Sequence, residues 1–231
     1  MDSRLKMPHI LRNTGASLLI VGLLALALTA WRWGLADIHA AGARSYIKSW
    51  WKGSKTPSDE EWEKVRSKLE KSLAYHPDFP LYVELLGTIH LTRSLNILLD
   101  DGETEQARSK AGNYFREVVT LRPSWPYAWA NILWIKTQDE DYDDEFFHAL
   151  DRSIALGSWE SKVQHIVTDT SLSAWDKLDD ARRRAALGTM KQTLHRNPKE
   201  IIELADFHGA MKTVCPLLAE DQRRKYCRDI P

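Results

Sequence analysis

The stretch RPSWPYAWANILW (residues 122–134) places two prolines and three tryptophans where an apolar, helix-forming segment begins. Proline has no amide hydrogen and disfavours helix in the residue before it, so Pro123 ends one helix. Pro126 can begin the next helix, because the first N–H groups of a helix have no partner inside it. The stretch therefore predicts a break between two helices, with Trp125 at the joint.

The same pattern recurs along the chain. HPDFPLYVELLG (residues 76–87) is an earlier copy, and ALGSWESKVQHIV (residues 155–167) repeats the Ser-Trp pair 34 residues later. The repeated anchor positions are Pro77, Pro123, Gly157 and Pro198. Apolar residues between them recur three and four apart and never alternate, which predicts an all-α fold. We expect Phe79, Trp125 and Trp159 to pack in the joints.

This repeat resembles the tetratricopeptide repeat (TPR), a 34-residue helix–turn–helix unit. The matching positions are Leu86-Gly87, Ala111, Phe115, Pro123, Trp129, Ile132 and Tyr142-Asp143. Leu133, Glu145 and Arg152 depart from the TPR pattern, so the array is TPR-like and irregular. The resemblance covers residues 60–210 and implies a solenoid of helical hairpins, in which each pair buries its apolar face against its neighbours.

The TPR resemblance also implies a partner-binding groove, lined by the first helix of each pair. The repeat phase places seven residues in it: Glu84, Thr88, Tyr127, Asn131, Trp134, Gln164 and Thr168. Such a polar and aromatic lining suits a peptide segment or a glycan. Trp134 has an alternative assignment as an ordinary core residue.

The N-terminal region contains a candidate membrane anchor. Ala16 to Trp31 carries no charge, and residues 16–36 approach the ~20 residues that a bilayer requires. A cleaved signal peptide is the alternative, with a small-residue site at Ala25-Leu26-Ala27. We favour a retained anchor, because the apolar run continues past that site. The predicted organisation is a cytoplasmic tail (1–15), a transmembrane helix (16–36), an amphipathic juxtamembrane segment (37–59) and a TPR-like helical domain with C-terminal capping helices (60–231).

The orientation of this anchor rests on the cysteines. Positive charges flank the apolar segment on both sides, so the positive-inside rule does not decide. Cys215 and Cys227 are the only cysteines, and they are a disulfide pair in an exported domain or two unrelated buried thiols. Together with the anchor, this pair leads us to predict a disulfide and a domain outside the cytoplasm.

Several classes of function are disfavoured. Lys plus Arg and Asp plus Glu both number 32, so the chain lacks the basic excess of a nucleic-acid-binding protein. The acidic stretch DEDYDDE (residues 139–145) lacks the spacing of a calcium loop and coincides with an inter-helix turn, where Asp caps a helix. The eight histidines show no metal-ligand spacing, and no nucleotide-binding or nucleophile motif occurs. We therefore predict no catalytic residue, metal or cofactor.

A second resemblance concerns the biological setting. The anchor, the diverged repeats, ALGSWESKVQ (155–164), SAWDKL (173–178) and Val214-Cys215 resemble the VpsP-type exopolysaccharide biosynthesis proteins of Gram-negative bacteria. This resemblance implies a role beside the inner-membrane machinery that makes or secretes a polysaccharide, and it implies no enzymatic activity. Together with the apolar segment and the cysteine pair, it leads us to predict a single-pass protein of the bacterial inner membrane with a periplasmic domain. The predicted function is a non-enzymatic scaffold that binds an inner-membrane partner, such as a polysaccharide polymerase or export protein. An assembly factor or accessory subunit of another inner-membrane complex is the alternative.

Overall fold

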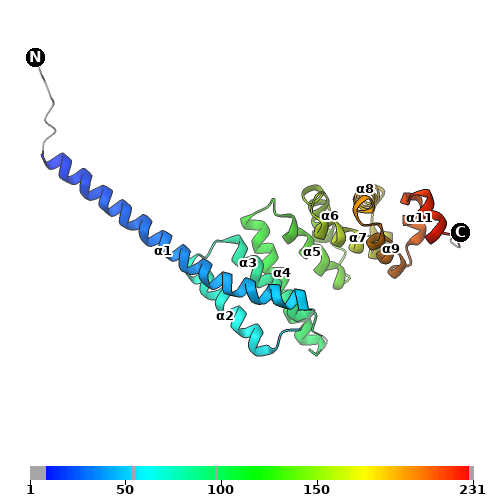
Figure 1. Ribbon diagram of the computed structural model, residues 1–231, viewed down its shortest axis with the longest axis horizontal. Helices are drawn as coiled ribbons and strands as arrows, with labels where there is room; N and C mark the ends of the chain where they lie inside the picture. The colour runs from blue at the N-terminus through cyan, green and yellow to red at the C-terminus, as the bar shows by residue number, and fades with distance from the viewer. Residues whose placement is uncertain (1–8, 54–55, 97, 229–231) are drawn as a thin grey trace, which may run out of the picture. The chain divides into compact units, whose positions relative to one another are not determined.

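The computed structural model describes residues 9–53, 56–96 and 98–228, and every regular element in these ranges is a helix (Figure 1). The longer helices are α1 (His9–Gly53), α2 (Asp59–Tyr75), α3 (Pro80–Ser94), α4 (Asp101–Leu121), α5 (Pro126–Gln138), α6 (Asp144–Leu156), α7 (Ser161–Ser173), α8 (Asp180–Arg196) and α9 (Pro198–Phe207). The chain ends with α10 (Met211–Val214) and α11 (Glu220–Tyr226), and two 3-10 turns, η1 (Trp175–Lys177) and η2 (Cys215–Leu217), lie between the later helices. The all-α prediction is confirmed. The chain forms two compact units that divide between Leu85 and Leu86, inside α3.

Helix α1 has an exposed apolar half followed by a half that is packed against the rest of the first unit. It is a single helix of 45 residues, and its large apolar side chains from Leu18 to Trp33 are more than half exposed. Among the described residues it is the one helix long and apolar enough to cross a membrane. The segment predicted as juxtamembrane continues the same helix as far as Gly53. Of the predicted cytoplasmic tail, residues 1–8 lie outside the described residues and the rest belongs to α1.

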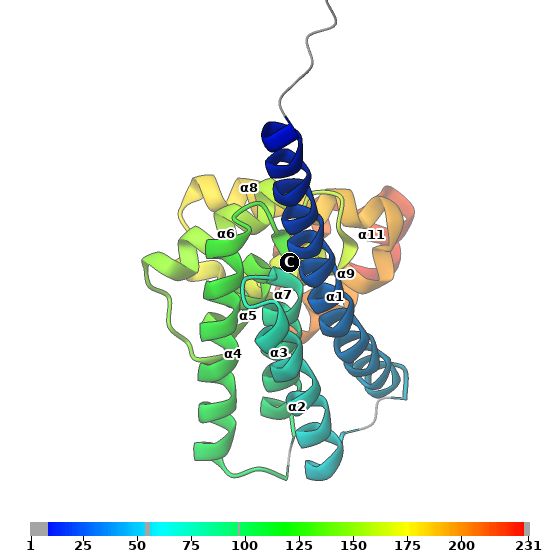
Figure 2. The ribbon, with the colours of Figure 1, turned by 90° about the vertical axis from the view of Figure 1, so that its left-hand side faces the viewer.

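The second half of α1 packs against α2. Its buried residues recur every three or four positions and form one stripe: Ala36, Ala40, Ala43, Ile47 and Trp50. Trp51 is 59% exposed, so of the two adjacent tryptophans only Trp50 joins the packed stripe. Figures 1 and 2 show α2 lying alongside this half of α1. The small alanines allow the two helices to approach closely.

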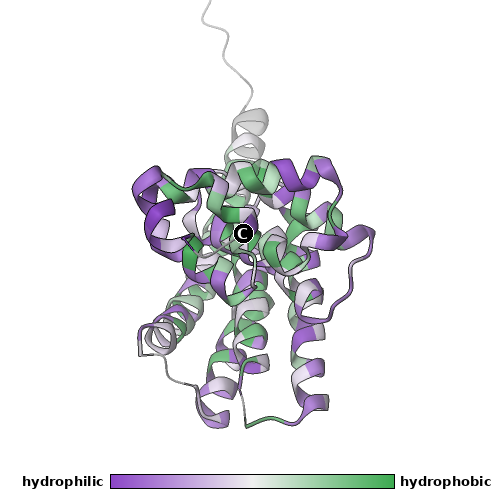
Figure 3. Ribbon diagram, turned by 90° about the vertical axis from the view of Figure 1, so that its right-hand side faces the viewer, coloured by the Kyte–Doolittle hydropathy of each residue, from purple (hydrophilic) through white to green (hydrophobic). Residues whose placement is uncertain are grey.

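In the second unit, helices begin in one of two ways, which deal differently with the unpaired backbone N–H groups of the first turn. Asp100, Asp143 and Asp179 precede α4, α6 and α8, and each side chain accepts a hydrogen bond from the backbone N–H three residues later. Pro126 and Pro198 instead begin α5 and α9. Helix α5 packs against α4, α6 and α7, and α7 packs against α8 and α9. The helices drawn in Figure 3 carry both hydrophilic and hydrophobic residues, as expected when one side of a helix faces its neighbours.

The predicted aromatic joints form only in part. In the first unit, Phe79 packs against the buried cluster of Ala36, Ala40 and Tyr82. Trp125 is half-buried, whereas Trp159 is 85% exposed. The prediction that Trp159 packs in a joint is therefore wrong.

The C-terminal helices share an apolar core with α7, α8 and α9. Its buried members include Leu172, Met190, Ile201, Val214 and Leu218. Cys215 and Cys227 form a disulfide, with their Cα atoms 6.1 Å apart. The bond links η2 to the residue after α11 and closes a short loop at the end of the chain. The pairing predicted from the sequence is confirmed.

Candidate functional site

The predicted groove residues on α3 and α5 are partly accessible. Glu84 and Thr88 lie one turn apart on α3 and are half-buried. Tyr127, Asn131 and Trp134 follow the same spacing on α5 and are also half-buried. Residues three and four apart share a helix face, so these three side chains form one stripe of α5. Trp134 therefore lies at the edge of the packed interior. Its partial burial is intermediate between the groove residue and the core residue that the sequence allowed.

The two predicted residues on α7 are buried. Gln164 is 1% exposed and Thr168 is 0% exposed. The amide of Gln164 donates to the Ser158 carbonyl oxygen and to Gln192 Oε1 (3.2 Å), and its own oxygen accepts from Arg196. Gln164 thus links α7 by hydrogen bonds to the turn before it and to α8. Neither side chain lines an accessible surface, which corrects the groove prediction at these positions.

The accessible face of α7 carries a different pair of residues. His165 Nδ1 lies 2.6 Å from Glu200 Oε1, and Asp169 Oδ1 lies 2.7 Å from His208 Nε2. His165 and Asp169 are one turn apart on α7, while Glu200 lies in the first turn of α9 and His208 just after its end. The two pairs therefore connect α7 to α9 along one face. A strict 34-residue step from Asn131 leads to His165, so the sequence repeat contained the signal for it.

A similar polar contact connects α5 to the start of α7. The Tyr127 hydroxyl donates to the carboxylate of Glu160, the residue immediately before α7. The Tyr127 ring also lies 5.2 Å from the ring of Trp125. We call the accessible side of these three helices the α5–α7–α9 surface; it consists of Tyr127, Asn131, Trp134, Glu160, His165, Asp169, Glu200 and His208.

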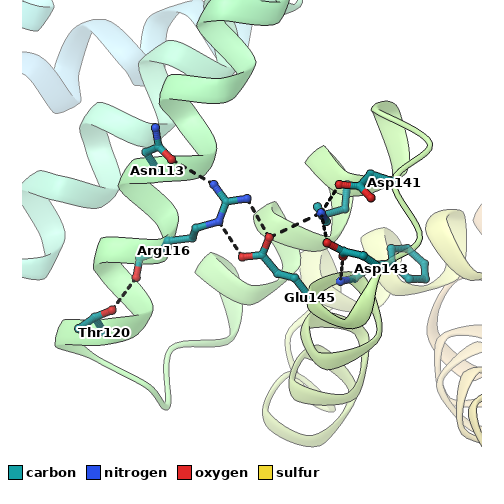
Figure 4. A network of polar contacts seen from close by, with 8 residues as sticks. Asn113, Arg116, Thr120, Asp141, Asp143 and Glu145 are labelled. Carbon is teal, nitrogen blue, oxygen red and sulfur yellow. Dashed lines mark hydrogen bonds and ion pairs between the residues drawn. The ribbon is translucent and has the colours of Figure 1, made fainter.

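The acidic stretch 139–145 is held by cations of the protein itself. Lys136 is 5% exposed, and its Nζ contacts Asp141, Asp143 (2.7 Å) and Glu145 (3.7 Å). Arg116 reaches Glu145 from α4 in a bidentate pair, with N–O distances of 2.6 and 2.8 Å (Figure 4). This network joins α4 to the turn between α5 and α6.

The network also shifts the pKa values of Lys136 and Glu145. Burial disfavours the charged form of Lys136, but its hydrogen bonds to Asp141 and Asp143 outweigh burial, so its pKa is raised. The guanidinium of Arg116 lowers the pKa of Glu145. Within the part of the chain that the structure describes, no group of His, Cys, Asp or Glu has a metal-binding arrangement. The acidic stretch is thus an internal charge network.

An open depression of about 700 Å³ lies between α4 and the same turn. It is lined mainly by charged and polar residues, among them Arg108, Arg116, Lys136 and Asp139. The cations pair with neighbouring acids, as Arg108 Nε does with Asp139 Oδ1 at 2.5 Å. Such mutual pairing ties the turn between α5 and α6 to α4.

Comparisons with known proteins add no functional assignment. No model of a known protein family matches this chain, and no curated protein matches it significantly.

Proposed function

We propose that this chain is a membrane-anchored, non-enzymatic scaffold that binds a protein partner through the α5–α7–α9 surface. The observation that carries the proposal is the continuity of α1. Its exposed apolar half, from Leu18 to Trp33, passes without a break into a half that is packed against α2. A helix with these two halves suits a protein whose folded part is held rigidly at a bilayer.

The helical domain is proposed to be a TPR-like array. Helices α5, α7 and α9 begin at residues 126, 161 and 198, close to the 34-residue TPR period. Alternate helices are also joined by similar ion pairs: Arg116 on α4 pairs with Glu145 on α6, and Asp151 on α6 pairs with Arg182 on α8 (2.8 Å). Each contact spans about one repeat, as stacking of similar hairpins requires.

A close contact at Gly87 supports the same proposal. A Cβ atom on Gly87 would lie 2.9 Å from Cε1 of Phe115, so only glycine allows the ring to lie against α3 at this point. The Leu-Gly pair and the Phe of the TPR pattern match Leu86-Gly87 and Phe115 in this sequence. Their close packing gives a physical reason for both matches.

The α5–α7–α9 surface is the proposed partner-binding face, because the first helices of TPR pairs line the concave side. It combines two aromatic rings, Tyr127 and Trp134, with His–carboxylate pairs. Aromatic and polar groups of this kind are typical of protein interfaces.

The proposed setting is the bacterial inner membrane, with the helical domain in the periplasm. Disulfides persist in oxidising compartments, so the Cys215–Cys227 bond supports an exported domain. The resemblance to VpsP-type proteins supports polysaccharide assembly or export as the process and a polymerase or export protein as the partner. Deletion of the gene should then abolish polymer output while precursor synthesis continues; normal output in the deletion strain would contradict this setting.

The binding surface is tested by co-purification in mild detergent. The double variant Asn131→Arg/His165→Ala changes the α5–α7–α9 surface, whereas Arg184→Ala/Lys191→Ala changes exposed residues of α8. We expect the first pair to lose the partner and the second to retain it, with equal helix content by circular dichroism. Equal retention by both variants would place the binding surface elsewhere.

The same experiment addresses the alternative function. If the retained proteins belong to a membrane complex unrelated to polysaccharide, the chain is an assembly factor or accessory subunit of that complex. The anchor and the binding surface are common to both proposals, so only the identity of the partner separates them.

A further inference from the structure

The turn between α2 and α3 reaches the point where the exposed half of α1 ends. The ring of His76 stacks on Trp33, with centroids 5.0 Å apart and an interplanar angle of 13°. Phe79 stacks in turn on His76, again at 5.0 Å. Trp33 is 52% exposed and ends the continuous stretch of exposed large apolar residues that begins at Leu18; Ile38, further along α1, is also exposed (69%) but stands beyond the first buried residue, Ala36. A small aromatic stack therefore stands at this boundary.

Helix α2 runs antiparallel to α1, which explains how the turn reaches Trp33. Moving along α1, His39 stacks on Tyr75 (6.0 Å), and Tyr46 lies beneath the ammonium of Lys64 (5.3 Å). Higher residue numbers on α1 thus meet lower numbers on α2. Since α2 has 17 residues, its two ends are separated by about 25 Å.

The position of the stack matches the expected depth of a membrane interface. A hydrocarbon core of ~30 Å accommodates ~20 helical residues, and a span of that length ending at Trp33 begins near residue 14. Arg32 is the first charged residue after the apolar run. Burial against the protein begins at Ala36, so no flexible linker separates the span from the folded unit. Rings with a polar edge favour the interfacial layer.

We propose that residues 76–79 form a second contact with the membrane, seated in the phospholipid headgroup layer beside Trp33. The proposal rests on the proposed anchoring by α1. The continuity of the aromatic stack with the exposed apolar side chains of α1 identifies the lipid surface as the occupant. The contact fixes the folded unit directly on the bilayer, with the N-terminal end of α2 pointing away from it.

Fluorescence quenching of single labels tests this contact. The variants Asp78→Cys, in the turn, and Glu60→Cys, in the first turn of α2, change exposed acidic residues of the same unit. Each is labelled with NBD and reconstituted, as the full chain, into phosphatidylcholine vesicles that contain headgroup-spin-labelled lipid. Since the native cysteines form a disulfide, the new thiol is the one that reacts.

We expect the spin-labelled lipid to quench the residue-78 label at least about twofold more strongly, because the two positions differ by most of the length of α2. Equal quenching, or a residue-78 label shielded from both lipid and aqueous iodide, would overturn the membrane contact. Flotation of the same vesicles separates this failure from that of the anchor. If the protein floats but the labels are equally quenched, only the second contact is wrong; if it does not float, the anchoring proposal fails as well.

Discussion

The joints around Trp125 and Trp159 share a sequence pattern but hold their tryptophans differently. In both joints a helix ends, Ser-Trp follows, and the next helix begins within two residues, at Pro126 or Ser161. Trp125 is nevertheless half-buried, while Trp159 is 85% exposed. The shared pattern determines where the helices break, and it leaves the environment of the tryptophan open.

The neighbours of each ring explain the difference. The guanidinium of Arg122 lies 3.9 Å from the ring centroid of Trp125, and the ring of Tyr127 lies 5.2 Å away. The positions 34 residues later hold Leu156 and Ser161, which supply neither a cation nor a ring. A tryptophan without such partners remains in solvent.

The repeated positions Pro123 and Gly157 also make different contacts in the two joints. The carbonyl oxygen of Pro123 accepts hydrogen bonds from Trp129 Nε1 (2.9 Å) and Arg152 Nη2 (3.0 Å). At Gly157, an added Cβ would lie only 2.2 Å from Cγ1 of Val163. In both joints a side chain therefore donates a hydrogen bond to a carbonyl oxygen of the turn, that of Pro123 in the first and that of Ser158 in the second, but the second joint also has direct packing of Val163 against a glycine.

The largest effect is expected at Gly157. Gly157→Ala forces Val163 or the end of α6 to move, which should lower the free energy of unfolding by about 1–3 kcal/mol. Denaturant unfolding in detergent measures this change. Gly188→Ala is the control, because a Cβ there meets nothing within 4 Å and alanine favours helix by about 0.5–1 kcal/mol. Equal stability of the two variants would show that the second joint is loosely packed.

The tryptophans themselves provide the next comparison. Trp125→Ala removes a half-buried ring and its contacts with Arg122 and Tyr127, so we expect a loss of about 1–2 kcal/mol. Trp159→Ala should change stability by less than about 0.5 kcal/mol, because the side chain is exposed. Thermal unfolding of the two variants side by side measures the difference. A larger loss at Trp159 would reverse the assignment of the joints.

The second joint can be made to resemble the first. Ser161→Tyr places a ring where Tyr127 stands in the first joint, and should stabilise the protein by about 0.5–1 kcal/mol by covering Trp159. Fluorine NMR of 5-fluorotryptophan-labelled protein would follow the exposure of Trp159, whose signal is assigned with Trp159→Phe. An unchanged signal would mean that the missing ring is not what leaves Trp159 exposed.

A smaller, pH-dependent effect should distinguish the α5–α6 turn, which the Lys136 network ties to α4. The pKa of Glu145 in the folded protein is lowered by Arg116, so its contribution to stability is complete above its ordinary value of 4.5 and is lost as the pH falls below it. We expect unfolding between about pH 5 and about pH 3 to depend less steeply on pH in Glu145→Gln. Hydrogen exchange in α4 and α6 measures the same loss locally. Identical pH profiles would indicate that the Arg116 pair does not persist in solution.

Prediction from the sequence succeeded for local features and failed for one helix face. The breaks at Pro123 and Gly157 follow from backbone chemistry, and the disulfide partners were the only two cysteines. On α7, the prediction selected Gln164, but the accessible side chain is His165. Successive helical residues point about 100° apart, so an error of one position exchanges a buried side chain for an exposed one.

By itself, the sequence determined where the chain breaks between helices at Pro123 and Gly157, which segment is apolar enough to cross a bilayer, and which cysteines can pair. These properties depend on residues close together in the chain. The tertiary structure alone decided that Gln164 is buried, that Trp159 is exposed, and that the second half of α1 packs against α2. These outcomes depend on which side chains from distant helices lie against each residue, and sequence patterns within a single helix do not contain that information.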